Sequence, residues 1–287
     1  MDKATLFDLL VEVEEVARAA GALLMKYYGT ISPSEIETKA QHDFVSVADK
    51  ECEALCLELL SKKYPNFDFL GEEGTSTNTN AMYRWIIDPL DGTTNFLRGI
   101  PIFAVSIGLE SRETLLPGSP FGKRILGVVY NPASNDLYCA AENCSAFRNG
   151  KPISVNHNRE FSDAIFATGF PFRAKQFTED YLSAFRKMFR AGSSMRRCGA
   201  ASIDLCWVAS GTLDGYWELN LAPWDIAGGE VIVREAGGIV GSIAQCDDPL
   251  VNGCIWAAPP QLYDEGFALL RSIFPETFAP KASRDAT

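Results

Sequence analysis

Residues Trp85–Phe96 read WIIDPLDGTTNF. The stretch opens with an apolar run that is typical of a buried strand, and Pro89 is expected to end the strand because proline lacks a backbone N–H and fixes φ. Asp88 and Asp91 flank this break, and the small residues Gly92–Thr94 follow, which let a backbone approach a ligand closely and can begin a helix. We therefore predict a strand, a turn and a helix, with two carboxylates at the turn.

A turn of this kind suits both a metal ion and a phosphate. Amide N–H groups at the positive end of a helix favour a phosphate, and two Asp side chains with a turn carbonyl favour a hard cation. Together they indicate phosphoryl chemistry. The alternative is that Asp88 and Asp91 only form the turn and cap the helix, as most loop aspartates do.

The full phrase resembles the signature of the inositol monophosphatase family, a lithium-sensitive group of magnesium-dependent phosphatases. Haloacid-dehalogenase-type phosphatases also carry an apolar strand before Asp-Gly-Thr, but the covalent nucleophile of their Asp-x-Asp motif stands two residues before the second Asp. Pro89 occupies that position here. Because proline cannot attack phosphorus, we do not expect a covalent aspartyl-phosphate from this motif.

The composition is that of a globular protein of 287 residues, with 47% hydrophobic residues and a net charge of −11. The length allows one large domain or two packed ones. The acidic balance disfavours direct binding to nucleic acid or to an anionic membrane. No apolar run of membrane-spanning length and no secretion signal is recognised, so we expect a cytoplasmic protein.

The cysteines and histidines give little support for a zinc site or a catalytic triad. Eight cysteines are spread along the chain without CxxC pairs, which favours reduced thiols. Cys52 and Cys56, four residues apart, favour a semi-buried helix face. The two histidines, His42 and His157, are too few for a histidine-rich zinc site or a Ser-His-Asp triad.

Apolar spacing predicts a long helix over residues 4–28 and a second one that ends at Tyr64–Pro65. Asp49 could simply cap the second helix. The segment Asp43–Asp49, however, resembles the family segment that ends in an aspartate orienting the catalytic threonine. Lys39 and Asp43 are weaker candidates from the same region.

A short strand, Phe67–Leu70, runs into Gly71–Gly74, where two glutamates stand side by side. Adjacent glutamates usually mark a solvated loop. The resemblance instead implies that Glu72 is a metal ligand and that Glu73 assists it.

Further strands are expected near residues 102–110, 125–130, 137–140 and 146–148, with a tight turn at Asn149–Gly150 and a polar loop over Ser111–Arg124. From about residue 156 the pattern becomes α/β. Strands are expected near 164–168, 194–198, 212–218, 238–241 and 253–258, and helices near 178–190, 200–209, 224–236 and 261–272.

Two segments of the second half resemble the substrate side of the family's site. Gly199–Ala201 follows two arginines at a strand-to-helix corner, where small residues permit either tight packing or a bound hydroxylated substrate. Asp225 opens a helix, where the dipole alone favours an acid. The resemblance implies that Asp225 is a metal ligand and that Glu218, seven residues earlier, contacts substrate.

The resemblance implies an α-β-α-β-α five-layer sandwich of sugar-phosphatase type, divided into an N-terminal half (1–155) and a C-terminal half (156–287). It also implies Mg²⁺ as cofactor, with two or three ions. The implied metal ligands are Glu72, Asp88 and the carbonyl of Leu90 for one ion and Asp88, Asp91 and Asp225 for a second, with Glu72 shared by a third. The implied catalytic residues are Thr93, Asp49 and Glu72, of which Thr93 would position or deprotonate water. The implied substrate contacts are Asp91, Gly92, Thr93, Gly199, Ala200, Ala201, Glu218 and Asp225.

The substrate is less sharply indicated. The nucleotide-phosphate branch of the superfamily commonly has Lys-Glu, and the histidinol-phosphate branch often Lys, at the position of Thr94–Asn95, so inositol phosphates are favoured. Fructose 1,6-bisphosphate and histidinol phosphate remain alternatives. A role as a regulatory protein-binding module is an alternative of another class. We also expect a homodimer, whose contacts the long loop over Ser111–Arg124 could alter.

Overall fold

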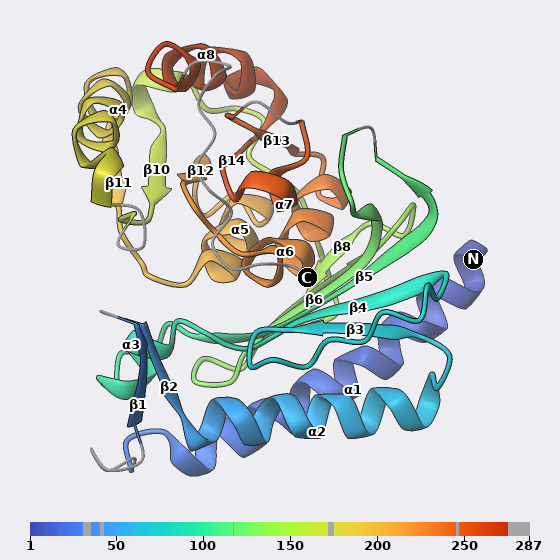
Figure 1. Ribbon diagram of the computed structural model, residues 1–287. Helices are drawn as coiled ribbons and strands as arrows, with labels where there is room; N and C mark the ends of the chain where they lie inside the picture. Colours follow the sequence, from blue (N-terminus) through green and yellow to red (C-terminus); the bar gives the residue numbers. More distant parts are fainter. Residues whose placement is uncertain (31–35, 41–42, 117, 172–174, 245–246, 275–287) are drawn as a thin grey trace.

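The computed structural model describes residues 1–30, 36–40, 43–116, 118–171, 175–244 and 247–274, with the backbone alone at 36–40, 43–45 and 114. These residues form five layers (Figure 1), namely two helices, a seven-stranded sheet, two helices, a five-stranded sheet and two helices. The expected layered sandwich is confirmed. The division at residue 155 stays a prediction.

The first helical layer consists of α1 (Lys3–Tyr27) and α2 (Val47–Lys63). It covers a sheet whose order follows the sequence, and in which only β3 and β4 run parallel. The strands are β3 (Asp68–Gly71), β4 (Tyr83–Asp91), β5 (Ala104–Leu115), β6 (Gly122–Asn131), β7 (Asp136–Ala141), β8 (Ala146–Arg148) and β9 (Lys151–Ile153).

The middle layer consists of α5 (Ala201–Ala209) and α6 (Pro223–Glu235), and the last of α4 (Thr178–Ala191) and α8 (Pro260–Arg271). Between them lies a mixed sheet of order β11-β10-β12-β14-β13. Its strands are β10 (Ile165–Thr168), β11 (Ser194–Arg196), β12 (Gly215–Glu218), β13 (Ile239–Ser242) and β14 (Ile255–Ala258). Smaller elements are β1 (Ile36–Ala40), β2 (Asp43–Ser46), α3 (Thr93–Leu97), α7 (Pro249–Asn252), and the 3₁₀ turns Phe161–Asp163 and Lys175–Phe177.

Alternating side chains place each sheet between two hydrophobic cores. In β4, Trp85 and Ile87 face α1 and α2, while Ile86 joins the core around the middle helices. In β12, Tyr216 belongs to that middle core and Trp217 to the core under α4 and α8. This period of two is what buries both faces of a sheet between helices.

Glycines let α6 lie directly on the seven-stranded sheet. A Cβ at Gly127 of β6 would stand 2.1 Å from the carbonyl oxygen of Gly228, and one at Gly108 of β5 would stand 2.8 Å from the Cβ of Ala227. Any larger side chain would therefore push the helix away from the sheet. This close approach brings the N-terminus of α6 to the end of β4.

Two expectations about β4 and β5 are wrong. Pro89 does not end its strand, because β4 continues to Asp91 through a bulge in which the pairing partners step from Ser106 to Ala104. Residues 111–124 are mostly strand, since β5 reaches Leu115 and β6 begins at Gly122. Backbone pairing with a neighbouring strand outweighed the polar composition.

Other expectations agree with the structure. The helices lie where the apolar spacing predicted them, and Asn149 and Gly150 form a turn with φ of 50° and 73°. The described cysteines are free thiols, whereas Cys246 lies outside the described residues. Among the described helices, none combines the length and apolar character required to cross a membrane.

Candidate active site

Three buried aspartates meet where the end of β4 faces the N-terminus of α6. One carboxylate oxygen each from Asp88, Asp91 and Asp225 lies within 4.8 Å of the other two. The backbone fixes two of these side chains, since Leu90 N–H donates to Asp88 Oδ1 (3.0 Å) and Ala222 N–H donates to Asp225 Oδ2 (2.7 Å). Asp225 thus completes the first turn of α6, as its dipole favours, and also faces the β4 carboxylates.

Asp91 is bound to the N-terminus of a second helix. Its carboxylate accepts hydrogen bonds from the backbone N–H groups of Ala201 (3.3 Å) and Ser202 (2.7 Å) and from the Ser202 hydroxyl (2.5 Å). These amides open α5 and have no partner within that helix, so Asp91 caps it from another part of the chain. Ser202 was not predicted as a site residue, since a serine in the first turn of an expected helix is its only local signal.

The electrostatics of the cluster favour a cation. Burial raises the pKa of Asp88 well above its usual value, and the charges of Glu72, Asp91 and Asp225 raise it further. Burial and then the charge of Asp225 raise the pKa of Asp91 to about 7, although the hydrogen bonds from Ser202 and Ala201 oppose this. Mutual repulsion of this kind is relieved by a bound cation, and carboxylate oxygens are the ligands that hard divalent ions prefer. The residues present therefore fit Mg²⁺ or a similar ion.

Asp49 connects the N-terminus of α2 to Thr93. Its Oδ2 accepts hydrogen bonds from the backbone N–H (2.8 Å) and hydroxyl (2.6 Å) of Ser46, so it does cap the helix. Its Oδ1 lies 3.2 Å from the Thr93 hydroxyl, which is also 3.1 Å from the carbonyl oxygen of Leu90 and can donate to either. Asp49 therefore caps α2 and also contacts Thr93, while its role in orienting a catalytic threonine stays a prediction.

Glu72 follows β3 and lies beside Asp88, since its side chain contributes to the raised pKa of Asp88. Its backbone N–H donates to the carbonyl oxygen of Ile87 (3.3 Å). It is not one of the three carboxylates that meet within 4.8 Å. Among the weaker candidates, the Glu73 backbone N–H donates to Glu53 Oε2 (2.8 Å). The Lys39 and Asp43 side chains and all of His42 lie outside the described residues, and His157 is exposed.

The Gly199–Ala201 corner packs against the Gly92 turn. Both glycines are left-handed, with φ of +87° at Gly92 and +88° at Gly199, a conformation that other residues rarely adopt. A Cβ at Gly92 would stand 3.2 Å from the Cβ of Ala200. The buried Asn95 amide donates to the carbonyl oxygens of Ile102 and Cys198, both at 2.8 Å, and so ties the two loops together. No local sequence pattern indicates this pair of hydrogen bonds.

Glu218 ends β12 and faces the same region. Tyr216 Oη donates to its carboxylate (2.6 Å), and a Cβ at Gly169 would stand 2.0 Å from that carboxylate. Burial raises the pKa of Glu218 to about 7, the Tyr216 hydrogen bond and the charge of Arg197 oppose this, and the charges of Asp225 and Asp91 add to it. The charges of the acidic cluster therefore act on Glu218.

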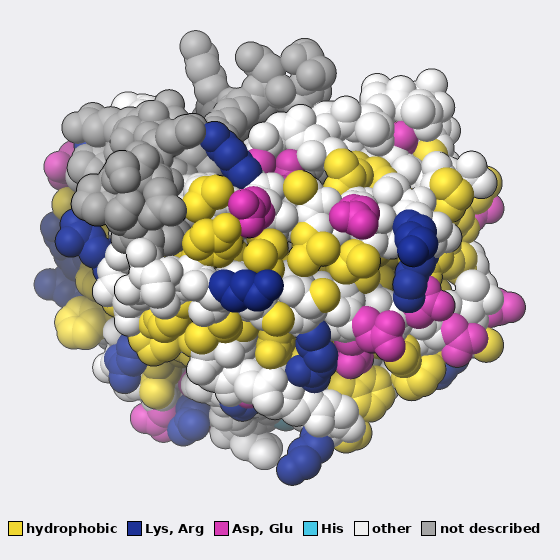
Figure 2. Space-filling view, turned by 90° about the horizontal axis from the view of Figure 1, so that it is seen from below, with side chains coloured by type: hydrophobic (Ala, Val, Ile, Leu, Met, Phe, Trp, Pro, Cys, Tyr) yellow, Lys and Arg dark blue, Asp and Glu magenta, His cyan; other side chains and the backbone are white. Residues whose placement is uncertain are grey.

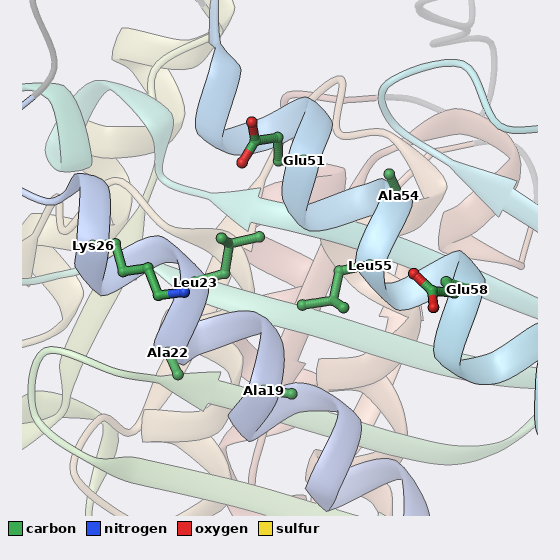
Figure 3. Close-up of a pocket in the computed structure, with 8 residues that line it drawn as sticks. All are labelled: Ala19, Ala22, Leu23, Lys26, Glu51, Ala54, Leu55 and Glu58. Atoms are coloured by element: carbon green, nitrogen blue, oxygen red, sulfur yellow. The ribbon is translucent and has the colours of Figure 1, made fainter.

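A separate groove of about 440 Å³ lies between α1 and α2 and does not include the acidic cluster. Leu23 and Leu55 line its floor, with Lys26, Glu51 and Glu58 at its sides (Figure 3). Figure 2, which views this outer side of the helical layer, shows apolar, basic and acidic side chains interspersed. We assign no role to this groove.

Comparison with known proteins gives consistent results. The profile of the inositol monophosphatase family matches residues 8–273. The chain is 39% identical to Nus factor SuhB of Escherichia coli K12, covering 89% of this chain and 92% of that protein. It is 41% identical to the fructose-1,6-bisphosphatase/inositol-1-monophosphatase of Aquifex aeolicus, covering 80% and 84%. The structure of inositol monophosphatase from Anabaena superposes with a TM-score of 0.81 at 33% identity, covering 94% and 98%.

Proposed function

Since this chain belongs to the inositol monophosphatase family and is thus a phosphoric monoester hydrolase, we propose that its preferred substrate is inositol monophosphate, which Mg²⁺-dependent attack by water would cleave to inositol and phosphate. The observation that carries the metal-dependent part is the group of three buried aspartates contributed by β4 and α6. The family is generally metal-dependent, and such a group is strained by repulsion unless a cation joins it.

The metal ligands that we propose are those implied by the motifs. Glu72, Asp88 and the Leu90 carbonyl would hold one Mg²⁺, Asp88, Asp91 and Asp225 would hold a second, and Glu72 would share a third. When bound, Mg²⁺ supplies Lewis-acid activation of the phosphate and a lowered pKa for a coordinated water. The mutual approach of Asp88, Asp91 and Asp225 supports the second of these ions.

The catalytic residues would act by orienting water and substrate. Asp49, anchored by Ser46, can accept the Thr93 hydroxyl proton in a hydrogen bond, which leaves a Thr93 lone pair to accept one from the attacking water. The amides of Gly92 and Thr93 would hold phosphate oxygens. No side chain in this arrangement has to form a bond to phosphorus.

The remaining contacts would bind the alcohol part of the substrate. Glu218 is held by Tyr216 and can accept a hydrogen bond from a substrate hydroxyl group, and the charges of Asp225 and Asp91 act on it. Gly199, Ala200 and Ala201 would let a hydroxylated substrate approach closely because they carry little or no side chain. A polyol monophosphate suits such a set of contacts.

The direct test is a panel of phosphate monoesters assayed with Mg²⁺, with and without millimolar Li⁺. We expect turnover of inositol monophosphate that EDTA abolishes and Li⁺ inhibits. Turnover that EDTA leaves intact would contradict the metal assignment. The name of the Aquifex relative includes fructose-1,6-bisphosphatase. A kcat/KM that is higher for fructose 1,6-bisphosphate or histidinol phosphate than for inositol monophosphate would change the proposed substrate and leave the proposed chemistry unchanged.

A second candidate is a regulatory protein-binding role, which the name Nus factor SuhB of the E. coli relative favours. The net charge of −11 supports a protein partner over direct contact with nucleic acid. We expect Asp88→Asn to lack phosphatase activity. Binding of a protein partner that survives in this variant would support the regulatory role. We also propose that the protein is a cytoplasmic homodimer. Light scattering on the purified protein tests its oligomeric state.

A further inference from the structure

Glu53 of α2 is a buried carboxylate that the catalytic scheme above does not use. Its side chain is 3% exposed and lies one helical turn beyond Asp49. Residues four apart share a helix face, so α2 directs two carboxylates toward the site from adjacent turns. Asp49 is occupied by Ser46 and Thr93, and Glu53 reaches a different segment.

That segment is the loop that carries Glu72. Glu53 Oε2 accepts a hydrogen bond from the backbone N–H of Glu73 (2.8 Å), and Oε1 accepts one from Thr75 (3.0 Å). Each carboxylate oxygen therefore holds one amide on the C-terminal side of Glu72. Charge-assisted hydrogen bonds to backbone amides are among the stronger contacts that fix a loop.

The residue before Glu72 is shaped to the same carboxylate. A Cβ at Gly71 would stand 2.4 Å from Glu53 Oε2 and 2.6 Å from Cδ, so only glycine lets the carboxylate lie against the chain there. The Gly71 N–H donates to the Thr75 carbonyl oxygen (2.7 Å), which closes the loop around Glu53. Glu72 thus stands between two neighbours, Gly71 and Glu73, that both contact the Glu53 carboxylate.

From these contacts we propose that Glu53 is a positioning residue that aims Glu72 at the metal site. This inference rests on the proposed role of Glu72 as a metal ligand. Glu53 touches neither metal nor substrate in the arrangement described. Replacing a residue that orients a metal ligand through hydrogen bonds commonly lowers metal affinity by about 10- to 100-fold.

Asp68 of β3 provides a matched control in the same loop. It is 1% exposed and accepts hydrogen bonds from the backbone N–H groups of Thr79 (3.0 Å) and Ala81 (3.2 Å). These amides lie beyond the segment that holds Glu72. Asp68→Asn therefore weakens the same kind of contact in the outer part of the loop, and it also weakens the ion pair of Asp68 with Arg112 (2.9 Å).

The experiment measures Mn²⁺ binding to the whole protein by the electron paramagnetic resonance signal of free Mn²⁺, together with Tm in EDTA. The variants are Glu53→Gln, Asp68→Asn and Glu72→Gln. Glu53→Gln preserves volume but turns an NH₂ group toward a backbone N–H, which cannot bond to it. We expect Glu53→Gln and Glu72→Gln each to raise the Mn²⁺ Kd at least tenfold, and Asp68→Asn to change it less than twofold while also lowering Tm.

An unchanged Kd in Glu53→Gln beside a weakened Glu72→Gln would overturn the inference and leave the metal assignment intact. Equal losses of affinity in Glu53→Gln and Asp68→Asn would also overturn it, because general loosening of the loop would then suffice. No effect of Glu72→Gln on Kd would overturn the metal role of Glu72 and this inference with it. Should Glu53→Gln not fold, Gly71→Ala displaces the same carboxylate and must weaken Mn²⁺ binding in the same direction.

Discussion

Helix α6 contacts the seven-stranded sheet through two charged clusters of opposite design. At its N-terminus, Asp225 meets Asp88 and Asp91, so that acid faces acid. Further along, Glu230 accepts two hydrogen bonds of 2.9 Å from Arg124 of β6, whose guanidinium also binds Asp248 at 2.8 Å. All three residues of this second cluster are buried. The same interface thus neutralises its charge at one place and concentrates negative charge at another.

The difference separates a structural role from a binding role. Buried charges without partners are costly, and the second cluster avoids that cost with an arginine of its own chain. The first cluster is satisfied by amide and hydroxyl donors but keeps its excess charge. Such an arrangement is reasonable if a cation from outside the chain completes it.

The largest effect is expected for Asp88→Asn at the acidic cluster. Loss of a ligand shared by two ions should remove several kcal/mol of transition-state stabilisation, which corresponds to a fall in kcat/KM on the order of 10³-fold. Because one negative charge is gone, Tm in EDTA should rise. Steady-state kinetics with Mg²⁺ and a thermal melt in EDTA measure both. A lower Tm in EDTA would contradict the repulsion described here.

Arg124→Met, at the second cluster, should instead lower the stability of the folded protein. It leaves buried Asp248 without its arginine and buried Glu230 with Arg234 alone (2.7 Å). Breaking a buried ion pair in this way commonly costs about 3–5 kcal/mol of unfolding free energy. Urea unfolding measures the loss. Lys123→Met in the same strand is the control, since Lys123 pairs with Glu142 at the surface and such pairs contribute about 0–1 kcal/mol. Similar losses in the two variants would remove the distinction between buried and exposed pairs.

The two clusters should also respond to pH with opposite sign. Burial alone would raise the pKa of Glu230, but the charges of Arg124 and Arg234 and the hydrogen bonds from Arg124 lower it. Its contribution is therefore present above the pKa of the unfolded chain and is lost as pH falls through the lowered value. The pKa of Asp91 is instead raised from 3.8 to about 7 in the metal-free protein. The folded state then binds more protons between these values, so stability falls as pH rises toward 7.

Tm measured in EDTA between pH 4.5 and 7.5 tests the pH dependence that is expected from Asp91. We expect a decline with rising pH that Asp91→Asn reduces and that saturating Mg²⁺ suppresses, because the ion binds the deprotonated carboxylates. A Tm in EDTA that rises over this range by the same amount in Asp91→Asn would contradict the assignment of the repulsion to this cluster.

The sequence predicted one of the clusters and not the other. The carboxylates at Asp88, Asp91 and Asp225 stand in local phrases next to strand ends and helix starts, where apolar periodicity and turn residues indicate the backbone. The Arg124–Glu230 pair joins residues 106 positions apart, and Arg124 stands at the end of a segment that was expected to be a polar loop. Glu53 and Ser202 were missed for the same reason, because their partners become neighbours only when the layers pack. The bulge at Pro89 was missed because proline usually ends a strand, whereas the irregular pairing at this bulge accommodates it within the strand.

The smallest effect is expected for Ser202→Ala, which tests how far hydrogen bonds moderate the acidic cluster. The hydroxyl donates to Asp91, and hydrogen bonds to charged groups contribute about 1.5–3 kcal/mol. The backbone N–H of Ser202 still donates to the same carboxylate in the variant, so we expect the lower end of this range in urea unfolding with Mg²⁺. In EDTA the loss of one donor should raise the pKa of Asp91 further and move the pH-dependent decline of Tm upward. Ser210→Ala is the control, since that hydroxyl contacts Trp207 and Thr212 at the other end of α5. A shift of the decline in both variants would mean that α5 as a whole, not its contact with Asp91, sets the titration of the cluster.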